Sequence, residues 1–222
     1  MKKLKPLKIG SVKIEFPIML APMAGYTDSA FRCVCRRYGA GAVYTEVANA
    51  VGMRMGSKPT LDLLETAEEE RPAAAHIYGA DADAIADAAR IAEDMGKFDF
   101  IDINCGCPVR KIVRKGSGAA LMKTPSKIGE IVTAVKEAVS IPVTVKTRTG
   151  MTPETINIEE IGHIVEDSGA SALAIHGRPA TQGHTGDVQW DQILKIKDLL
   201  SIPVIGNGGI YTAEAALEAM DT

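Results

Sequence analysis

The segment with the clearest chemical potential is Asn104-Cys-Gly-Cys-Pro108, which continues the apolar run Phe100–Asn104. Gly106 and Pro108 predict a loop directly after that run, because both residue types interrupt regular secondary structure. A cysteine thiol in such a loop can act as a general acid that gives a proton to a bound substrate. The sequence therefore indicates Cys107 as a proton donor.

The four cysteines form two Cys-x-Cys pairs, Cys33 with Cys35 and Cys105 with Cys107. Structural zinc sites typically use Cys-x2–4-Cys spacing, so these pairs are too tight and no metal is expected. Cysteine is also often a small buried apolar residue, and this interpretation suits Cys33 and Cys35 in a helix-like segment. Four cysteines in 222 residues do not resemble a secreted disulfide scaffold, so we expect a reduced, cytoplasmic protein.

Basic side chains lie at the ends of two other apolar runs. Lys146 and Arg148 lie at the end of one run, and His176 and Arg178 lie at the end of the next. A lysine there can neutralise an anionic cofactor ring or phosphate, and an arginine offers a planar fork to a carbonyl or carboxylate. A neutral imidazole can hydrogen-bond a flavin or a substrate, although a histidine satisfied within the core is the alternative.

Small residues surround two further strand ends. Asn207, Gly208 and Gly209 lie in Gly-Asn-Gly-Gly, where backbone N–H groups can approach a phosphate. Barrels often bind phosphate after their seventh and eighth strands. Pro22 and Met23 begin Pro-Met-Ala-Gly-Tyr-Thr-Asp, a stretch without an obvious base or nucleophile. Its expected role is to hold a flat ligand against the backbone.

Four basic residues directly follow the cysteine loop, namely Arg110, Lys111, Arg114 and Lys115. They fit the solvated start of a helix, and they could also guide a polyanion toward the loop. The whole chain has 25 basic and 28 acidic residues and a formal net charge of -3. That balance by itself argues against a nucleic-acid partner, which usually leaves a basic footprint.

These residues need elements to position them, and apolar runs alternate with amphipathic segments along the chain. The runs are mostly apolar on both faces, which is typical of parallel strands covered by helices. Strands are predicted over residues 17–23, 42–47, 73–78, 100–104, 141–147, 172–176 and 202–206. Helices are predicted over residues 28–38, 81–95, 125–139, 158–167, 191–200 and 213–220.

Repeated βα units form either an open doubly wound sheet or a closed barrel. The dinucleotide fingerprint Gly-x-Gly-x-x-Gly is absent after the first run, which disfavours the open sheet. A barrel gathers its strand ends around one axis, and polar residues end nearly every run. They are Glu46, His76, Asn104, Lys146, His176 and Asn207. We therefore predict a TIM (β/α)8-type barrel, as one domain over residues 1–222.

A complete barrel needs eight strands and about 250 residues, whereas this sequence contains seven recognisable βα units. We therefore expect a fragment that lacks the eighth unit. No stretch reaches the roughly 18 consecutive apolar residues of a membrane span, and no signal-peptide pattern follows the basic N-terminus. A monomer without membrane attachment is expected.

Six segments, taken in order, resemble the tRNA-dihydrouridine synthase family, especially its bacterial type. They are residues 21–28, 102–109, 116–120, 145–148, 175–178 and 206–208. Each segment alone is modest, but the ordered set at compatible spacing covers essentially the whole chain and is specific.

The resemblance implies an FMN-binding barrel that reduces particular uridines in tRNA to 5,6-dihydrouridine, with NADPH as the reductant. Hydride would pass from N5 of the flavin to C6 of uracil, and Cys107 would give a proton to C5. By position, the flavin would be contacted by Pro22, Met23, His76, Lys146 and His176, with its phosphate held by Asn207, Gly208 and Gly209. The uracil would be contacted by Asn104, Arg148 and Arg178.

Two departures from the family's pattern affect these roles. The family's third strand usually ends in a glutamine that faces the pyrimidine edge of the flavin, whereas this chain has His76. An imidazole supplies part of that hydrogen bonding, but not both halves of an amide pair at once. The family's eighth strand and its C-terminal helical domain, which grips tRNA, have no counterpart in the sequence.

Two other interpretations stay open. One is an FMN barrel of the dihydroorotate or dihydropyrimidine dehydrogenase type, which also presents an Asn-x-x-Cys-Pro loop to a pyrimidine ring. The basic residues after Cys107 and the Ile-His-Gly-Arg segment favour the tRNA enzyme. The other is an inactive, truncated RNA-binding remnant, against which the intact Cys107 and cofactor-facing residues argue.

Overall fold

A sheet of seven parallel-paired strands forms the centre of the computed structural model, which describes residues 5–221. The strands are β3 (Val43–Tyr44), β4 (Ala48–Asn49), β5 (Ala73–Tyr78), β6 (Phe100–Asn104), β7 (Val143–Arg148), β8 (Ala172–His176) and β9 (Val204–Asn207). Their order is β3-β5-β6-β7-β8-β9, and β4 also pairs with β5. Because neighbours in space follow the order of the chain, the sheet is a parallel half-barrel of the TIM type.

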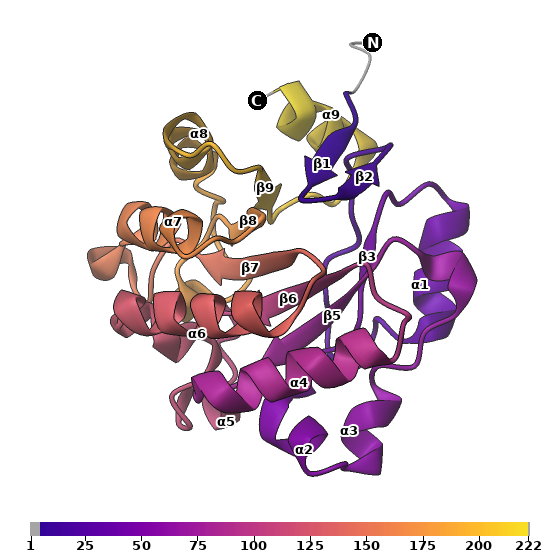
Figure 1. Ribbon diagram of the computed structural model, residues 1–222. Helices are drawn as coiled ribbons and strands as arrows, with labels where there is room; N and C mark the ends of the chain where they lie inside the picture. The colour runs from indigo at the N-terminus through magenta and orange to yellow at the C-terminus, as the bar shows by residue number, and fades with distance from the viewer. Residues whose placement is uncertain (1–4, 222) are drawn as a thin grey trace.

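Helices connect the strands and cover the outer face of the sheet. They are α1 (Ser29–Arg37), α2 (Ala50–Arg54), α3 (Lys58–Asp62), α4 (Ala82–Asp94), α5 (Arg110–Val113), α6 (Pro125–Ala138), α7 (Ile158–Asp167), α8 (Trp190–Leu199) and α9 (Ala213–Asp221). Short 3-10 turns occur at Glu68–Glu70, Gly118–Lys123, Pro153–Thr155 and Ala180–Gln182. Helices α4, α6 and α7 lie side by side against the strands (Figure 1). The predicted barrel class is confirmed.

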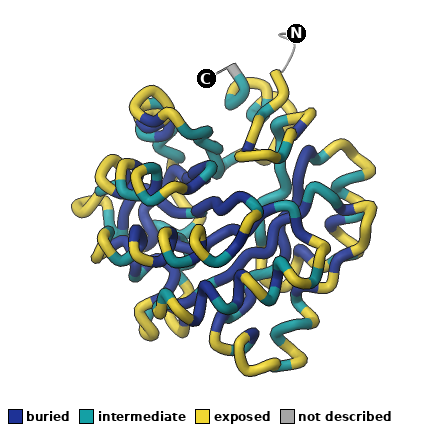
Figure 2. Tube along the Cα trace, in the orientation of Figure 1, coloured by how far each residue is buried: buried dark blue, intermediate teal, exposed yellow. Residues whose placement is uncertain are grey.

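Strands β5 to β8 are almost entirely buried on both faces, which explains their continuous apolar sequences, whereas β9 is half-buried (Figure 2). On the outer face, residues such as Ile77, Ile103 and Val145 pack against the helices in the larger core. On the inner face, Phe100 belongs to a second core that includes Ile14. Ile14 comes from a hairpin of β1 (Leu7–Ile9) and β2 (Val12–Ile14), which the sequence did not predict.

The first predicted strand, 17–23, is wrong in its extent. It is reduced to a single parallel bridge between Met19 and Ala42, supported by hydrogen bonds from Leu20 N and Gly41 N. Pro17 and Pro22 lack the backbone N–H groups that a longer ladder would need, so pairing does not extend past the bridge.

The other boundaries agree more closely, with short elements as the exception. The predicted strand 42–47 is replaced by two strands of two residues, β3 and β4. Helices α2, α3 and α5 have four or five residues each, too few to show a helical period in the sequence. The six longer helices begin and end within two residues of their predicted bounds.

At the N-terminal ends of the strands, the same clamp occurs twice. The sequence Ser-Ile-Pro-Val precedes or begins β7 and β9, and a glutamate from a neighbouring helix caps each serine. Glu93 of α4 accepts from Ser140 N at 2.8 Å and Ser140 Oγ at 2.6 Å. Glu166 of α7 accepts from Ser201 N and Oγ, both at 2.7 Å. These hydrogen bonds lower the pKa of both glutamates.

At the opposite ends, the strand register aligns the polar residues in rows. His76 pairs with Asp102 across β5 and β6, and Asn104 pairs with Lys146 across β6 and β7. Arg148 pairs with His176, which pairs in turn with Asn207. Residues paired across strands share a face, as do residues two apart along a strand. The fold therefore directs this set of side chains into the interior at one end of the half-barrel.

Candidate active site

Cys107 lies in a loop whose backbone is held on both sides. The Asn104 side-chain oxygen accepts hydrogen bonds from Gly106 N at 3.1 Å and Cys107 N at 2.9 Å. The Cys107 carbonyl accepts from Ala119 N at 3.0 Å. Gly118 has φ +60°, and a Cβ there would lie 2.8 Å from that carbonyl, so the close approach requires glycine. The loop is thus fixed in one conformation.

The two cysteines of this loop differ in their surroundings. Cys105 is fully buried in the outer core, and burial raises the pKa of its thiol. Cys107 is only partly buried. Of the two, Cys107 is the more accessible thiol, and its role as proton donor stays a prediction.

A chain of buried hydrogen bonds runs from β7 to this loop. Thr144 Oγ1 donates to Asp102 Oδ1 at 2.5 Å, and His76 Nδ1 lies 2.6 Å from Asp102 Oδ2. His76 Nε2 lies 3.0 Å from the Asn104 side-chain nitrogen. All four residues are buried. Both ring nitrogens of His76 are therefore engaged within the protein, and its predicted flavin contact stays a prediction.

Basic side chains converge at the ends of β7 and β8. Lys146 Nζ lies 3.2 Å from Asn207 Oδ1. Arg148 donates from Nε to Gly106 O at 3.1 Å and from Nη1 to Gly183 O at 2.8 Å. Arg178 donates to Gly186 O at 2.8 Å and to His176 Nε2 at 3.2 Å.

No carboxylate among the described residues forms an ion pair with Lys146, Arg148 or Arg178. Burial lowers the pKa of Lys146 to about 8, an effect that Asp102 opposes and Arg148 reinforces. Burial also lowers the pKa of Arg148 to about 10. Buried cations that form no ion pair with a carboxylate stabilise a bound anion, which restores part of the compensation that burial removed.

His176 stands within this cationic group. Burial, and then the charges of Arg148 and Lys146, lower its pKa to about 3, so the ring is neutral near pH 7. Its Nε2 accepts from Arg178, which leaves the proton on Nδ1. His184, which no sequence pattern singles out, lies beside it with a ring-centroid distance of 5.5 Å. Only the fold of the glycine-rich loop brings the two rings together.

The Gly-Asn-Gly-Gly turn lies against His176. Gly208 and Gly209 have φ +117° and +71°, conformations that L side chains rarely adopt. A Cβ on Gly208 would lie 2.8 Å from the His176 ring. The turn thus keeps a bare backbone next to the cations, as an oxyanion-binding turn requires.

The first loop is folded on itself and held by Glu46, which lies in the segment between β3 and β4. Met23 O accepts from Tyr26 N at 3.1 Å and Thr27 N at 3.0 Å, and the Met23 side chain is 40% exposed. The Glu46 carboxylate accepts from Gly25 N. Glu46 was noted in the sequence only as a strand-end residue, and the structure shows that it orders the loop that contains Pro22 and Met23.

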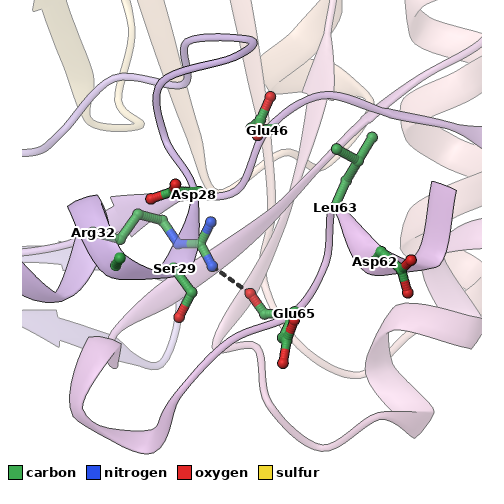
Figure 3. A pocket seen from close by; sticks show the side chains of 8 residues that line it. Asp28, Ser29, Arg32, Glu46, Asp62, Leu63 and Glu65 are labelled. Atoms are coloured by element: carbon green, nitrogen blue, oxygen red, sulfur yellow. Dashed lines mark hydrogen bonds between the residues drawn. The ribbon is translucent and has the colours of Figure 1, made fainter. Parts of the chain in front are cut away.

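A separate cavity of about 320 Å³ lies behind this loop, at the start of α1 (Figure 3). Its lining includes Arg32 and four acidic residues, Asp28, Glu46, Asp62 and Glu65. Arg32 is itself paired with the buried Glu70 and donates to Glu65 O. An anionic ligand is disfavoured there, so the cationic strand ends are the candidate site.

Residues 5–221 contain neither a metal-binding cluster nor a membrane-spanning helix. No group of three or more His, Cys, Asp or Glu side chains is placed to hold a metal ion. No helix in this part of the chain has both the length and the apolar character to cross a membrane.

Among solved structures, a 2-naphthoyl-CoA reductase in complex with 2-naphthoyl-CoA superposes with a TM-score of 0.71. The match covers 98% of this chain and 48% of that chain at 13% sequence identity. At that identity the likeness concerns the fold alone, which it supports.

Sequence relatives are closer. A probable tRNA-dihydrouridine synthase 1 from Synechocystis sp. is 39% identical over 98% of this chain and 61% of its own length. The tRNA-dihydrouridine synthase B of Xanthomonas axonopodis pv. citri is 38% identical over 96% of this chain, and that of Pasteurella multocida is 39% identical over 97%. The matches cover 64% of each of these two relatives, so the chain spans less than two thirds of their length.

A family model described as dihydrouridine synthase matches residues 19–222. The match includes the cysteine loop, the cationic strand ends and the glycine turn, and it extends over all seven strands of the sheet. The chain therefore belongs to the dihydrouridine synthase family.

Proposed function

We propose that this chain reduces specific uridines in tRNA to 5,6-dihydrouridine, with FMN as the cofactor and NADPH as the electron source. The observation that carries the proposal is the placement of Cys107 in a pinned loop beside uncompensated cations. The relatives named tRNA-dihydrouridine synthase support the substrate class. Residues 1–222 are proposed to act as one FMN-binding barrel unit, monomeric and cytoplasmic.

The residues at the strand ends suit an anionic flavin mononucleotide. Lys146 offers a positive charge without an acidic partner, and the bare backbone at Asn207, Gly208 and Gly209 suits a phosphate. Neutral His176 can donate from Nδ1 to a ring acceptor. Pro22 and the exposed Met23 side chain offer an apolar surface for a flat ring. His76 would contact the flavin only at the cost of a bond that it makes within the protein.

The reaction then divides between cofactor and protein. When bound and reduced by NADPH, FMN supplies the hydride that is added to C6 of the uracil ring. Cys107 gives its thiol proton to C5, so one hydride and one proton saturate the C5–C6 bond. Asn104, Arg148 and Arg178 orient the uracil by its polar edge, and the basic residues after Cys107 attract the tRNA backbone.

The Cys107→Ala variant tests the proton donor. Purified protein reconstituted with FMN should keep the visible absorbance of bound flavin, while dihydrouridine formation on an unmodified tRNA transcript falls about 10²–10⁴-fold, the range for a lost general acid. Cys105→Ala is the matched control, since it removes the buried thiol of the same loop and should keep most of the turnover.

Near-normal turnover by Cys107→Ala would exclude the assigned role. Free uracil and dihydroorotate should be assayed in parallel with tRNA. Turnover of either small molecule without any on tRNA would instead indicate the dihydroorotate or dihydropyrimidine dehydrogenase type. Failure to retain FMN after reconstitution would favour an inactive remnant.

A further inference from the structure

We infer that His76 is a positioning residue for Cys107, acting through Asn104, and that this role replaces a direct contact with a ligand. The inference rests on the proposed function, because it assumes that Cys107 is the proton donor. The carrying observation is a continuous series of hydrogen bonds from β7 to the backbone of the cysteine loop.

The orientation of the Asn104 amide follows from its neighbours. Its oxygen faces two backbone N–H groups, those of Gly106 and Cys107, at 3.1 and 2.9 Å. The opposite orientation would set an NH₂ group against two donors, so the amide nitrogen must point to His76. At 3.0 Å, His76 Nε2 then has to accept that hydrogen bond and so carries no proton.

The rest of the series is fixed by the same reasoning. An imidazole without a proton on Nε2 carries it on Nδ1, which donates to Asp102 Oδ2 at 2.6 Å. The other oxygen of Asp102 accepts from Thr144 Oγ1 at 2.5 Å. The exposed fractions of His76, Asp102 and Thr144 are 2%, 0% and 1%. Buried polar groups that lose a partner are costly, so each bond restrains the next.

The role of the series follows from its last hydrogen bond, which joins Asn104 to the cysteine loop. Asn104 binds the backbone N–H of Cys107, so a rotation of the amide would leave the residue that carries the thiol held only through its carbonyl, by Ala119 N. Arg148 does not replace this restraint, since it binds Gly106 O and leaves the two N–H groups to Asn104. A small displacement of a proton donor is enough to slow a reaction strongly.

Two amide variants of His76 test the hydrogen bonds of Nδ1 and Nε2 separately. In His76→Asn the side-chain nitrogen takes the place of Nδ1 and serves Asp102, but no acceptor reaches Asn104. In His76→Gln the longer side chain carries an acceptor to the place of Nε2 and serves Asn104. The inference predicts that glutamine preserves the cysteine loop and that asparagine does not, although the two amides are chemically alike.

Amide hydrogen exchange at Gly106 and Cys107, followed by NMR, measures how well the backbone hydrogen bonds of the cysteine loop are kept. The measurement needs neither FMN nor tRNA. Exchange at both amides should be about tenfold faster in His76→Asn, as expected for one lost hydrogen bond. In His76→Gln it should stay within about threefold of wild type, the lower range of such an effect. In the tRNA assay, His76→Asn should lower kcat by about tenfold or more and leave KM for tRNA nearly unchanged.

Glu93→Gln is the matched control, because it weakens a clamp at the opposite end of the half-barrel. It should lower the melting temperature without changing exchange at Gly106 and Cys107 or the kcat. If His76→Asn does not fold, Thr144→Val removes the hydroxyl at the far end and should shift exchange in the same direction by a smaller factor.

Unchanged exchange in His76→Asn would overturn the inference, as would equal effects of asparagine and glutamine. Faster exchange with an unchanged kcat would overturn the positioning role and leave only a structural one. If wild-type protein forms no dihydrouridine, the proposed function fails, while the exchange measurements still decide whether His76 holds the loop.

Discussion

Two histidines occupy similar places in the half-barrel, His76 at the end of β5 and His176 at the end of β8, and their surroundings are opposite in charge. His76 is bound by Asp102 and Asn104, so both of its ring nitrogens have partners within the protein. His176 lies among Lys146, Arg148 and Arg178, none of which forms an ion pair with a carboxylate in the described chain. The first histidine is hydrogen-bonded within the protein, whereas the cations around the second form no ion pair and would be compensated by a bound anion.

Because of this difference, the two regions suit different roles in the site. A self-contained network holds one geometry with or without a ligand, which suits a region that positions a proton donor. A cationic region without counter-charges gains most when an anion binds, which suits the grip on a phosphate or an anionic ring. Variants that supply or remove a charge in the cationic region should therefore act mainly on anion binding there.

Adding a carboxylate to the cationic region should have the largest effect on FMN affinity. Ala174 pairs with Lys146 across β7 and β8 and precedes His176 by two residues, so its side chain shares their face. Ala174→Asp should pair internally with Lys146 and lower FMN affinity about 100-fold relative to Ala174→Asn, which matches it in size without the charge. Fluorescence titration with FMN measures both, and equal affinities would contradict the electrostatic account.

Removing the central cation should have the next largest effect. Lys146→Met keeps much of the apolar stem and removes the charge, so FMN affinity should fall about 10- to 100-fold, as for a lost charge-assisted hydrogen bond. Lys97→Met, on an exposed turn before β6, is the control and should bind FMN as wild type does. A similar loss in both variants would show that the effect is one of net charge alone.

Lys146 also sets a pH dependence whose sign can be stated. Its pKa is lowered from 10.5 to about 8, and an anion prefers the protonated lysine. FMN affinity should therefore be highest below pH 8 and fall as the pH rises above it. Without ligand, the unfolded chain holds this proton between pH 8 and 10.5 while the folded chain does not, so stability should rise across that window. Lys146→Met should remove both trends.

The sequence predicted the cationic half of this comparison better than the network half. The half-barrel, its six longer helices and the positions of Lys146, Arg148 and His176 follow from apolar runs and from the rule that parallel strands end on one face. The network could not be found in the same way. Asp102 sits inside an apolar strand, and only the register shows that it meets both His76 and Thr144.

The misses at the edges of the fold have local causes. The β1–β2 hairpin and α5 are too short to show a period, and the prolines of the first run leave a bridge in place of a strand. His184 reaches His176 through a loop whose path depends on glycines and on Arg178 binding Gly186 O. Such contacts depend on tertiary structure, and no residue spacing indicates them.

Acid should lower the stability of the folded protein through His176, and the variant His176→Gln should lose less stability. The pKa of His176 lies at about 3 in the folded state against an ordinary 6.5, so between these values only the unfolded chain binds the proton. Stability should therefore fall as the pH drops from 6.5 toward 3. Urea unfolding at pH 6.5 and 5 isolates this group from most carboxylates, and the decrease should be smaller in His176→Gln. An equal decrease in both proteins would contradict the assignment.

The smallest expected effect concerns the contact between the two rings of the cationic region. His184 contributes to the lowered pKa of His176, but after burial, Arg148 and Lys146. His184→Gln should therefore raise the pKa of His176 only slightly and leave FMN affinity nearly unchanged, whereas Arg148→Gln should raise that pKa more. NMR titration of the His176 ring protons compares the two variants. A larger shift in His184→Gln would mean that the neighbouring ring, and not the uncompensated cations, keeps His176 neutral.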